Sequence, residues 1–199
     1  MRTSRFAQVA VALVLVVGAG IAWVFGGDGG DPSRPRTDQV QGDPRRPATP
    51  KPNPPLVQPG GTVLLDTADT FRNVEKAQVL APRDLEVLEP HVSKVTLLVT
   101  DNTGVTTGIW LFELKSGQEP AAALDAVTGL YTDSGFETLS VNPIVQAVTP
   151  PTGTTTYRAH YLSRHGLIRV EAYGPDPEAT RVAFTDLLKS QLDNTPQLS

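Results

Sequence analysis

Residues 95–114 read VTLLVTDNTGVTTGIWLFEL and carry the pattern that decides the predicted fold of the C-terminal part of the chain. Two runs rich in β-branched and aromatic residues, Val95–Thr100 and Thr106–Leu114, flank the polar sequence DNTG at 101–104. A polar cluster that ends in glycine favours a tight turn between two strands. The stretch therefore predicts a β-hairpin.

The second strand of this hairpin carries apolar side chains on both faces. Side chains alternate along a strand, which puts Ile109 and Leu111 on one face and Trp110, Phe112 and Leu114 on the other. A strand that is apolar on both faces is typical of a covered sheet. We therefore expect this strand to be central, with a layer packed on each side.

A second hairpin is predicted over Thr154–Ser163 and Leu167–Tyr173. A two-residue turn at His165 and Gly166 sets the register of such a hairpin. This register places apolar pairs on one face and pairs His160 with Glu171 on the other.

The polar face of the second hairpin is the candidate site. It carries Arg158, His160, Arg169 and Glu171. A carboxylate opposite a histidine favours the imidazolium and suggests proton handling, and two arginines offer donors for an anion. The alternative is a solvated sheet face, on which cross-strand charge pairs are ordinary.

Two helices complete the pattern. The first is expected after Gly117, with Pro120 in its first turn and Gly135 at its end. The second begins at Asp176, whose side chain suits a helix cap, followed by Pro177 at the first helical position.

The remaining segments are less clear. Val141–Val148 predicts a strand interrupted or edged by Pro143, and residues 63–92 are compatible with either helix or strand beyond Val63–Leu65. The order of elements predicts an α+β fold, in which helices pack on an antiparallel sheet, over residues 61–195, with a short tail at 196–199.

The N-terminal part predicts a membrane anchor. Residues 6–25 are twenty uncharged residues, the length that a helix needs to cross a bilayer. Arg2 and Arg5 precede this span and Asp28 and Asp31 follow it, which favours a cytoplasmic N-terminus at 1–5 and export of the rest. A single-pass protein of the cell membrane is the result.

The alternative to the anchor is a cleavable signal peptide. It is compatible with the small residues Gly20 and Ala22, although the apolar run continues through Phe25.

Residues 26–60 form the segment that follows the span. They hold nine of the eighteen prolines and predict a disordered Pro/Gly-rich tether, or a ligand for proline-binding modules.

Composition excludes several classes of function. The chain has no cysteine, so it forms neither disulfides nor thiolate metal sites. From Gly61 onward ten Lys or Arg stand against seventeen Asp or Glu, a formal charge of about −7 that disfavours nucleic acid as a partner. Three scattered histidines and the lack of phosphate-binding or nucleophile motifs predict neither a metal nor another cofactor.

The layout of anchor, proline-rich spacer and small α+β domain resembles that of many bacterial envelope proteins, a resemblance of architecture alone. It implies a membrane-anchored binding or accessory module of the cell envelope, with an envelope protein or a small ligand as partner. The alternative is an envelope hydrolase or transferase that uses His160 and Glu171 and presents them in a concave pocket.

Overall fold

The computed structural model describes residues 55–151 and 153–198. The predicted cytoplasmic N-terminus at 1–5, the transmembrane span at 6–25 with its alternative cleavage site at Gly20 and Ala22, and the tether up to residue 54 lie outside the described residues. Within the described part, no helix combines the length and apolar character that a bilayer crossing requires.

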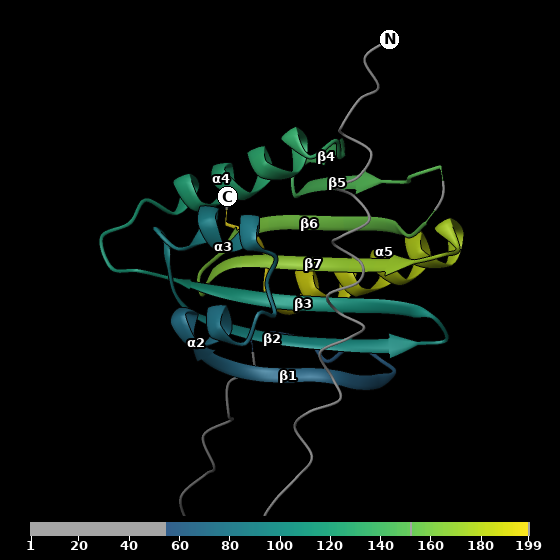
Figure 1. Cartoon of the computed structure of the whole chain (residues 1–199), viewed down its shortest axis with the longest axis horizontal. Coiled ribbons are helices and arrows are strands. Elements are labelled where there is room, and N and C mark those ends of the chain that lie inside the picture. Colours follow the sequence, from purple (N-terminus) through teal and green to yellow (C-terminus); the bar gives the residue numbers. More distant parts are fainter. Residues whose placement is uncertain (1–54, 152, 199) are drawn as a thin grey trace, which may run out of the picture. The chain divides into compact units, whose positions relative to one another are not determined.

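The described residues contain seven strands, which form one antiparallel sheet in the order β1-β2-β3-β7-β6-β5-β4 (Figure 1). The strands are β1 Thr62–Thr70, β2 Val92–Asn102, β3 Val105–Leu114, β4 Glu137–Val141, β5 Ile144–Val148, β6 Thr155–Ser163 and β7 Gly166–Gly174. Hairpin connections join most neighbours, and the β3–β7 pair brings the two hairpins predicted from the sequence side by side.

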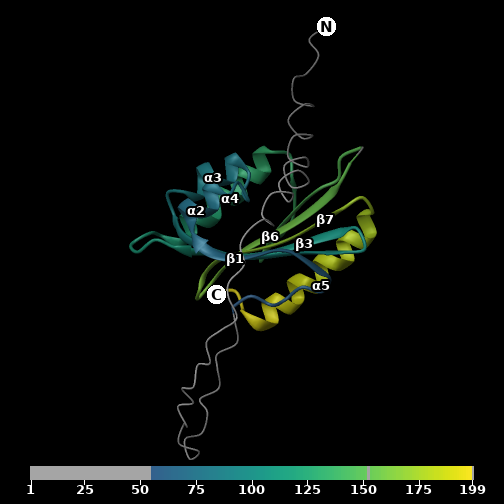
Figure 2. The same ribbon diagram turned by 60° about the horizontal axis from the view of Figure 1, so that its bottom comes forward.

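Four helices are described, and they divide between the two faces of the sheet (Figure 2). They are α2 Phe71–Lys76, α3 Pro82–Leu88, α4 Pro120–Asp133 and α5 Pro177–Asn194. The three helices α2, α3 and α4 cover one face, and α5 is the one helix of the described residues that lies across the other. The result is the predicted α+β fold, with a helical layer on each side of an antiparallel sheet.

The central position of β3 is confirmed. Trp110 and Phe112 belong to the core under α2–α4, whereas Ile109 and Leu111 belong to the core under α5. Burial on both faces explains why this strand reads as an almost continuous apolar run.

The two predicted helix starts are confirmed at Pro120 and Pro177. The Asp176 carboxylate accepts hydrogen bonds from the backbone N–H groups of Glu178 and Ala179, at 2.9 and 3.1 Å. These bonds satisfy two donors that the first turn of α5 leaves free.

The strand predicted at Val141–Val148 is wrong in extent. The chain turns at Asn142 and Pro143, which separate β4 from β5, so a further strand precedes the turn. β4 forms the edge of the sheet and is largely exposed, and for this reason it lacks an apolar pattern. At the other edge β1 runs directly into α2, which resolves the ambiguity of residues 63–92.

The register of the second hairpin differs from the prediction by two residues. The turn residues are Arg164 and His165, and Ser163 pairs with Gly166. Gly166 begins β7 and packs closely on β3, where a Cβ would stand 2.3 Å from the carbonyl oxygen of Phe112. A shift of two residues changes every cross-strand partner but keeps every side chain on its face.

Candidate functional site

The four residues of the predicted polar face lie together, but inside the protein. Arg158, His160, Arg169 and Glu171 are between 0% and 9% exposed. They lie on the side of β6 and β7 that α3 and α4 cover, since Arg169 bonds to Asp84 of α3 and Arg158 lies over the Tyr131 ring of α4. The expectation of a solvated sheet face is therefore wrong.

The cross-strand pairs also differ from the expected ones. Arg158 Nε donates to Glu171 Oε2 at 3.0 Å, and Arg169 Nε donates to His160 Nε2 at 3.0 Å. His160 and Glu171 are not register partners, so the predicted pair of histidine and carboxylate is wrong. The two-residue shift of the turn is the cause.

Two residues from the covering helices complete the arrangement. Asp84 of α3 accepts a hydrogen bond from Arg169 Nη2 at 2.6 Å, and the Tyr131 hydroxyl of α4 donates to the same carboxylate oxygen. We refer to the following six residues as the buried charged cluster: Asp84, Tyr131, Arg158, His160, Arg169 and Glu171. The cluster contains two carboxylates and two guanidinium groups, so its formal charges balance.

Burial and the neighbouring charges shift the pKa values of three members of the cluster, Asp84, Tyr131 and His160. Burial alone raises the pKa of Asp84, but the guanidinium groups of Arg169 and Arg158 outweigh it and hold that pKa below its usual value. Burial, with the positive charges of Arg169 and Arg158, lowers the pKa of His160 well below 6.5. Burial raises the pKa of Tyr131, so this phenol stays protonated.

His160 is therefore a neutral imidazole. Its Nε2 accepts from Arg169, which places the ring proton on Nδ1. The ring stacks on Tyr131 with centroids 5.5 Å apart, and the Arg158 guanidinium lies over the same Tyr131 ring, 4.3 Å from its centroid. Cation–π contact and stacking offset part of the desolvation of these groups.

The cluster is tied to the aromatic core as well. Trp110 Nε1 donates to Glu171 Oε1 at 3.0 Å, so both carboxylate oxygens of Glu171 accept a hydrogen bond. Gly108 lies opposite Glu171 on β3, and a Cβ at Gly108 would stand 2.9 Å from Oε1. Glycine at this position makes room for the buried carboxylate.

Three buried polar atoms have no hydrogen-bond partner within the described residues. They are Gln146 Oε1, Arg158 Nη1 and His160 Nδ1. Gln146 and Arg158 are direct cross-strand partners, so an unpaired acceptor and an unpaired donor belong to facing residues. Buried atoms of this kind commonly bind an internal water.

This geometry provides no catalytic pair. His160 cannot act as a general base towards a substrate, because its Nε2 accepts a hydrogen bond from Arg169 and the residue is fully buried. The carboxylates of Asp84 and Glu171 are held by arginines and by Tyr131 or Trp110. The expectation that His160 and Glu171 line a concave pocket is wrong, and the cluster acts as a structural link between sheet and helices.

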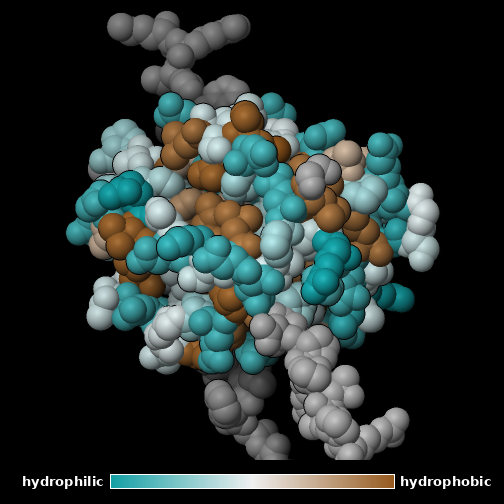
Figure 3. Space-filling view, turned by 180° about the vertical axis from the view of Figure 1, so that it is seen from behind, coloured by the Kyte–Doolittle hydropathy of each residue, from teal (hydrophilic) through white to brown (hydrophobic). Residues whose placement is uncertain are grey.

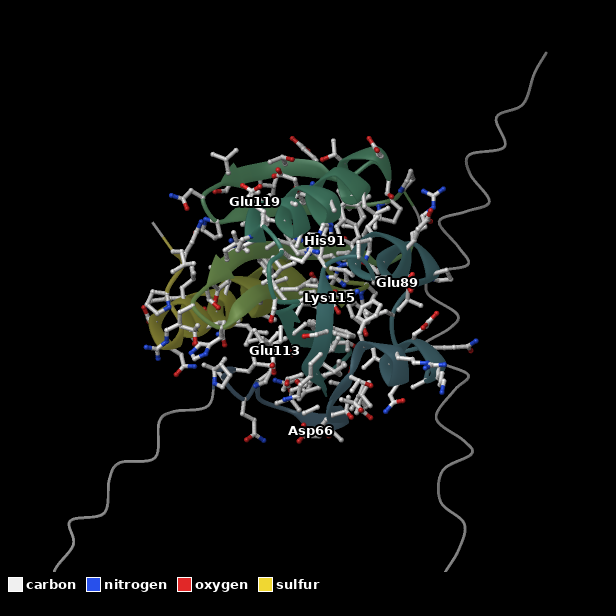
Figure 4. All side chains as sticks on the ribbon, turned by 90° about the vertical axis from the view of Figure 1, so that its left-hand side faces the viewer. Asp66, Glu89, His91, Glu113, Lys115 and Glu119 are labelled. Carbon is white, nitrogen blue, oxygen red and sulfur yellow. The ribbon has the colours of Figure 1, made fainter. Side chains whose placement is uncertain are left out.

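The surface offers two shallow hollows beside α2 and α3. They share Phe71, Glu75 and Glu89, and neither reaches the buried charged cluster. In the same region Lys115 Nζ donates to the carbonyl oxygen of Glu89 at 2.6 Å (Figure 4). Within the described residues, no three His, Asp or Glu side chains gather closely enough to hold a metal ion.

The other two histidines are at the surface. His91 Nδ1 lies 3.3 Å from Gln118 Oε1, and Figure 4 shows the ring at the end of the domain near Lys115. His165 is a turn residue, with its Nε2 accepting from Arg164 at 2.9 Å.

Asp84 and Tyr131 are members of the site that were not predicted from the sequence. Two signals point to them. Asp84 stands four residues before the fully buried Leu88 on one face of a short helix, and a carboxylate on a buried face needs a cation. Tyr131 shares the buried face of its helix with Ala123 and Val127, and a buried hydroxyl needs an acceptor.

No protein-family model matches the chain, and no curated protein and no solved structure is significantly similar to it.

Proposed function

We propose that the chain is a membrane-anchored binding or accessory module of a bacterial cell envelope, which works without catalysis. Residues 6–25 span the cell membrane once, residues 1–5 remain in the cytoplasm, and the α+β domain lies outside. The observation that carries the proposal is the twenty-residue uncharged run between Arg2 and Arg5 on one side and Asp28 and Asp31 on the other.

The buried charged cluster supports the non-catalytic part of the proposal. Its acids and bases neutralise one another inside the domain, and a substrate has no access to His160. The domain carries about seven excess negative charges, which disfavours nucleic acid and leaves an envelope protein or a small ligand as partner.

Membrane topology is tested with single cysteines, because the chain has none of its own. Thr3→Cys marks the N-terminus and Val182→Cys marks α5, where the side chain is 44% exposed. In spheroplasts a membrane-impermeant maleimide is expected to label the second variant at once and the first only after lysis.

Each other result has a distinct meaning. Labelling of Thr3→Cys in intact spheroplasts reverses the orientation, and failure to label Val182→Cys until lysis contradicts export of the domain. If mass spectrometry shows that the mature chain has lost residue 3, residues 6–25 belong to a cleaved signal peptide and not to an anchor.

The binding role is tested by crosslinking the full chain in its membrane and identifying captured proteins by mass spectrometry. The control is residues 1–54 alone, which contain the anchor and lack the domain. A partner that depends on the domain supports a binding module. If both chains capture the same proteins, the result contradicts a protein partner of the domain, and a small ligand becomes the expected partner.

A further inference from the structure

Residues 55–60, which the sequence assigns to the end of the tether, lie against the domain. We call this segment, Pro-Leu-Val-Gln-Pro-Gly, the strap. In Figure 2 it is the dark blue segment without regular structure that runs beside α5. Contacts of the domain therefore begin before Gly61, on the face that carries α5.

The backbone of the strap is recognised by one buried amide. Gln191 of α5 is fully buried, its Oε1 accepts from Val57 N at 2.9 Å, and its Nε2 donates to the carbonyl oxygen of Pro55 at 2.8 Å. Thr195 Oγ1 donates to the same carbonyl oxygen at 2.7 Å. A side-chain amide has both a donor and an acceptor, so Gln191 alone pairs with a backbone N–H and a backbone carbonyl of the extended strap.

Further contacts hold the rest of the strap. Leu56 and Val57 pack against the core under α5, Pro59 is buried, and Thr100 Oγ1 of β2 donates to the carbonyl oxygen of Gly60 at 3.0 Å. Figure 3, seen from this side, shows apolar side chains in patches among polar ones. The strap is thus seated by alternating apolar and backbone contacts.

All four of these hydrogen bonds are made to distant parts of the chain. Their partners are 134, 136, 140 and 40 positions away. The connection to β1 runs through Gly60, where a Cβ would have no neighbour within 4 Å, and Gly61, which has φ of 110° and packs closely against the Asp101 carbonyl. Because glycine adopts many backbone conformations, this junction allows the strap to leave while the sheet stays intact.

We propose that Thr100, Gln191 and Thr195, with the apolar surface beside them, form a binding site for an extended proline-containing peptide, and that the strap is its ligand in cis. When the strap leaves, the same site takes the strap of a second copy of the chain. The contacts are identical in both states, as in the exchange of an element between protomers. Attachment in cis gives the chain's own strap a high effective concentration, so the exchange depends on local crowding of copies. The inference holds whether or not residues 6–25 span a membrane.

A labelled peptide with the sequence of residues 53–61, NPPLVQPGG, tests the site in trans. In the full chain, the substitutions Leu56→Asp and Val57→Asp weaken the binding of the strap in cis and leave the residues of the site unchanged. In fluorescence-anisotropy titrations we expect this variant to bind the peptide at least tenfold more tightly than the wild type. Addition of Gln191→Leu should abolish the binding, and the peptide NPPDDQPGG should not bind.

The proposal is overturned if the Asp variant has a native circular-dichroism spectrum and binds no peptide. It is also overturned if Gln191→Leu binds as well as its parent, or if NPPDDQPGG binds equally.

Hydrogen exchange of the Val57 amide, followed by NMR on the full chain, keeps the test independent of the Asp variant. We expect this amide to exchange by local opening, faster than amides of β7, and at least tenfold faster again in Gln191→Leu. Gln146→Leu is the matched control, since Gln146 is equally buried and donates to the backbone of α4 at 3.1 Å. Exchange of Val57 at the rate of β7, or no response to Gln191→Leu, makes the strap a fixed part of the fold.

Discussion

Arg169 Nη2 lies 2.6 Å from Asp84 Oδ1, a contact that joins the middle of β7 to α3 across 85 positions of the chain. The two side chains are 2% and 5% exposed. Removing two charges from water costs nearly as much as their attraction returns, so such a pair adds little net stability. Removal of one partner is a different matter, because it leaves a buried charge without compensation.

Asp84→Asn should therefore destabilise the domain strongly. The substitution preserves size but leaves the Arg169 guanidinium buried without a counter-ion, and it weakens the acceptor of Tyr131. We expect the free energy of unfolding to fall by about 3–5 kcal/mol in urea titrations. Glu178→Gln is the matched control: Glu178 pairs with Arg181 at the surface, where the side chains are 70% and 51% exposed, so its loss should leave the urea midpoint close to that of the wild type.

The double variant Asp84→Leu with Arg169→Met separates the pair from the helix contact itself. Removal of both charges spares the lone buried cation, so the double variant should be more stable than Asp84→Asn. Equal losses in Asp84→Asn and Glu178→Gln contradict the assignment of a buried, mutually dependent pair.

Acid should weaken the domain through His160. Burial first, and then Arg169 and Arg158, lower the pKa of His160 in the folded chain, whereas the unfolded chain has a pKa of about 6.5. Below about pH 6.5 the unfolded chain binds a proton that the folded chain does not, so stability is complete above that pH and falls as the pH drops towards the lowered pKa. Asp84, with a pKa below its usual 3.8, adds a second loss as the pH falls through that lower range.

Urea titrations between pH 7.5 and pH 5 check this dependence. The slope should approach about 1.4 kcal/mol per pH unit in the wild type and flatten in His160→Gln, whose amide oxygen still accepts from Arg169. His165→Gln changes an exposed turn residue and should keep the wild-type slope. A slope that survives His160→Gln assigns the titration to another group.

Much of the sheet was predictable because its central strands have one-sided or two-sided apolar patterns. The alternation in residues 154–173 placed Arg158, His160, Arg169 and Glu171 on one face, and the structure keeps them there. Side-chain parity survives a register error of two residues.

The interior position of that face was not predictable from local pattern. A polar face on a hairpin is typical of solvent exposure, and the compensating Asp84 and Tyr131 come from helices far away in the sequence. Local patterns also do not distinguish two registers that differ by two residues, and they do not show that β3 closely approaches Gly166.

Gly166→Ala tests that close approach directly. Gly166 has φ of 134°, and a Cβ would stand 2.3 Å from the Phe112 carbonyl oxygen, which belongs to the backbone and cannot rotate away. Backbone strain alone should lower the free energy of unfolding by about 1–3 kcal/mol. The Cβ also pushes β3 away from β7, so the total loss should be larger. Gly129→Ala is the control: this glycine lies within α4 with open space around it, and alanine there should stabilise by about 0.5–1 kcal/mol. If both variants unfold at the wild-type urea midpoint, the register is not set by the contact between Gly166 and Phe112.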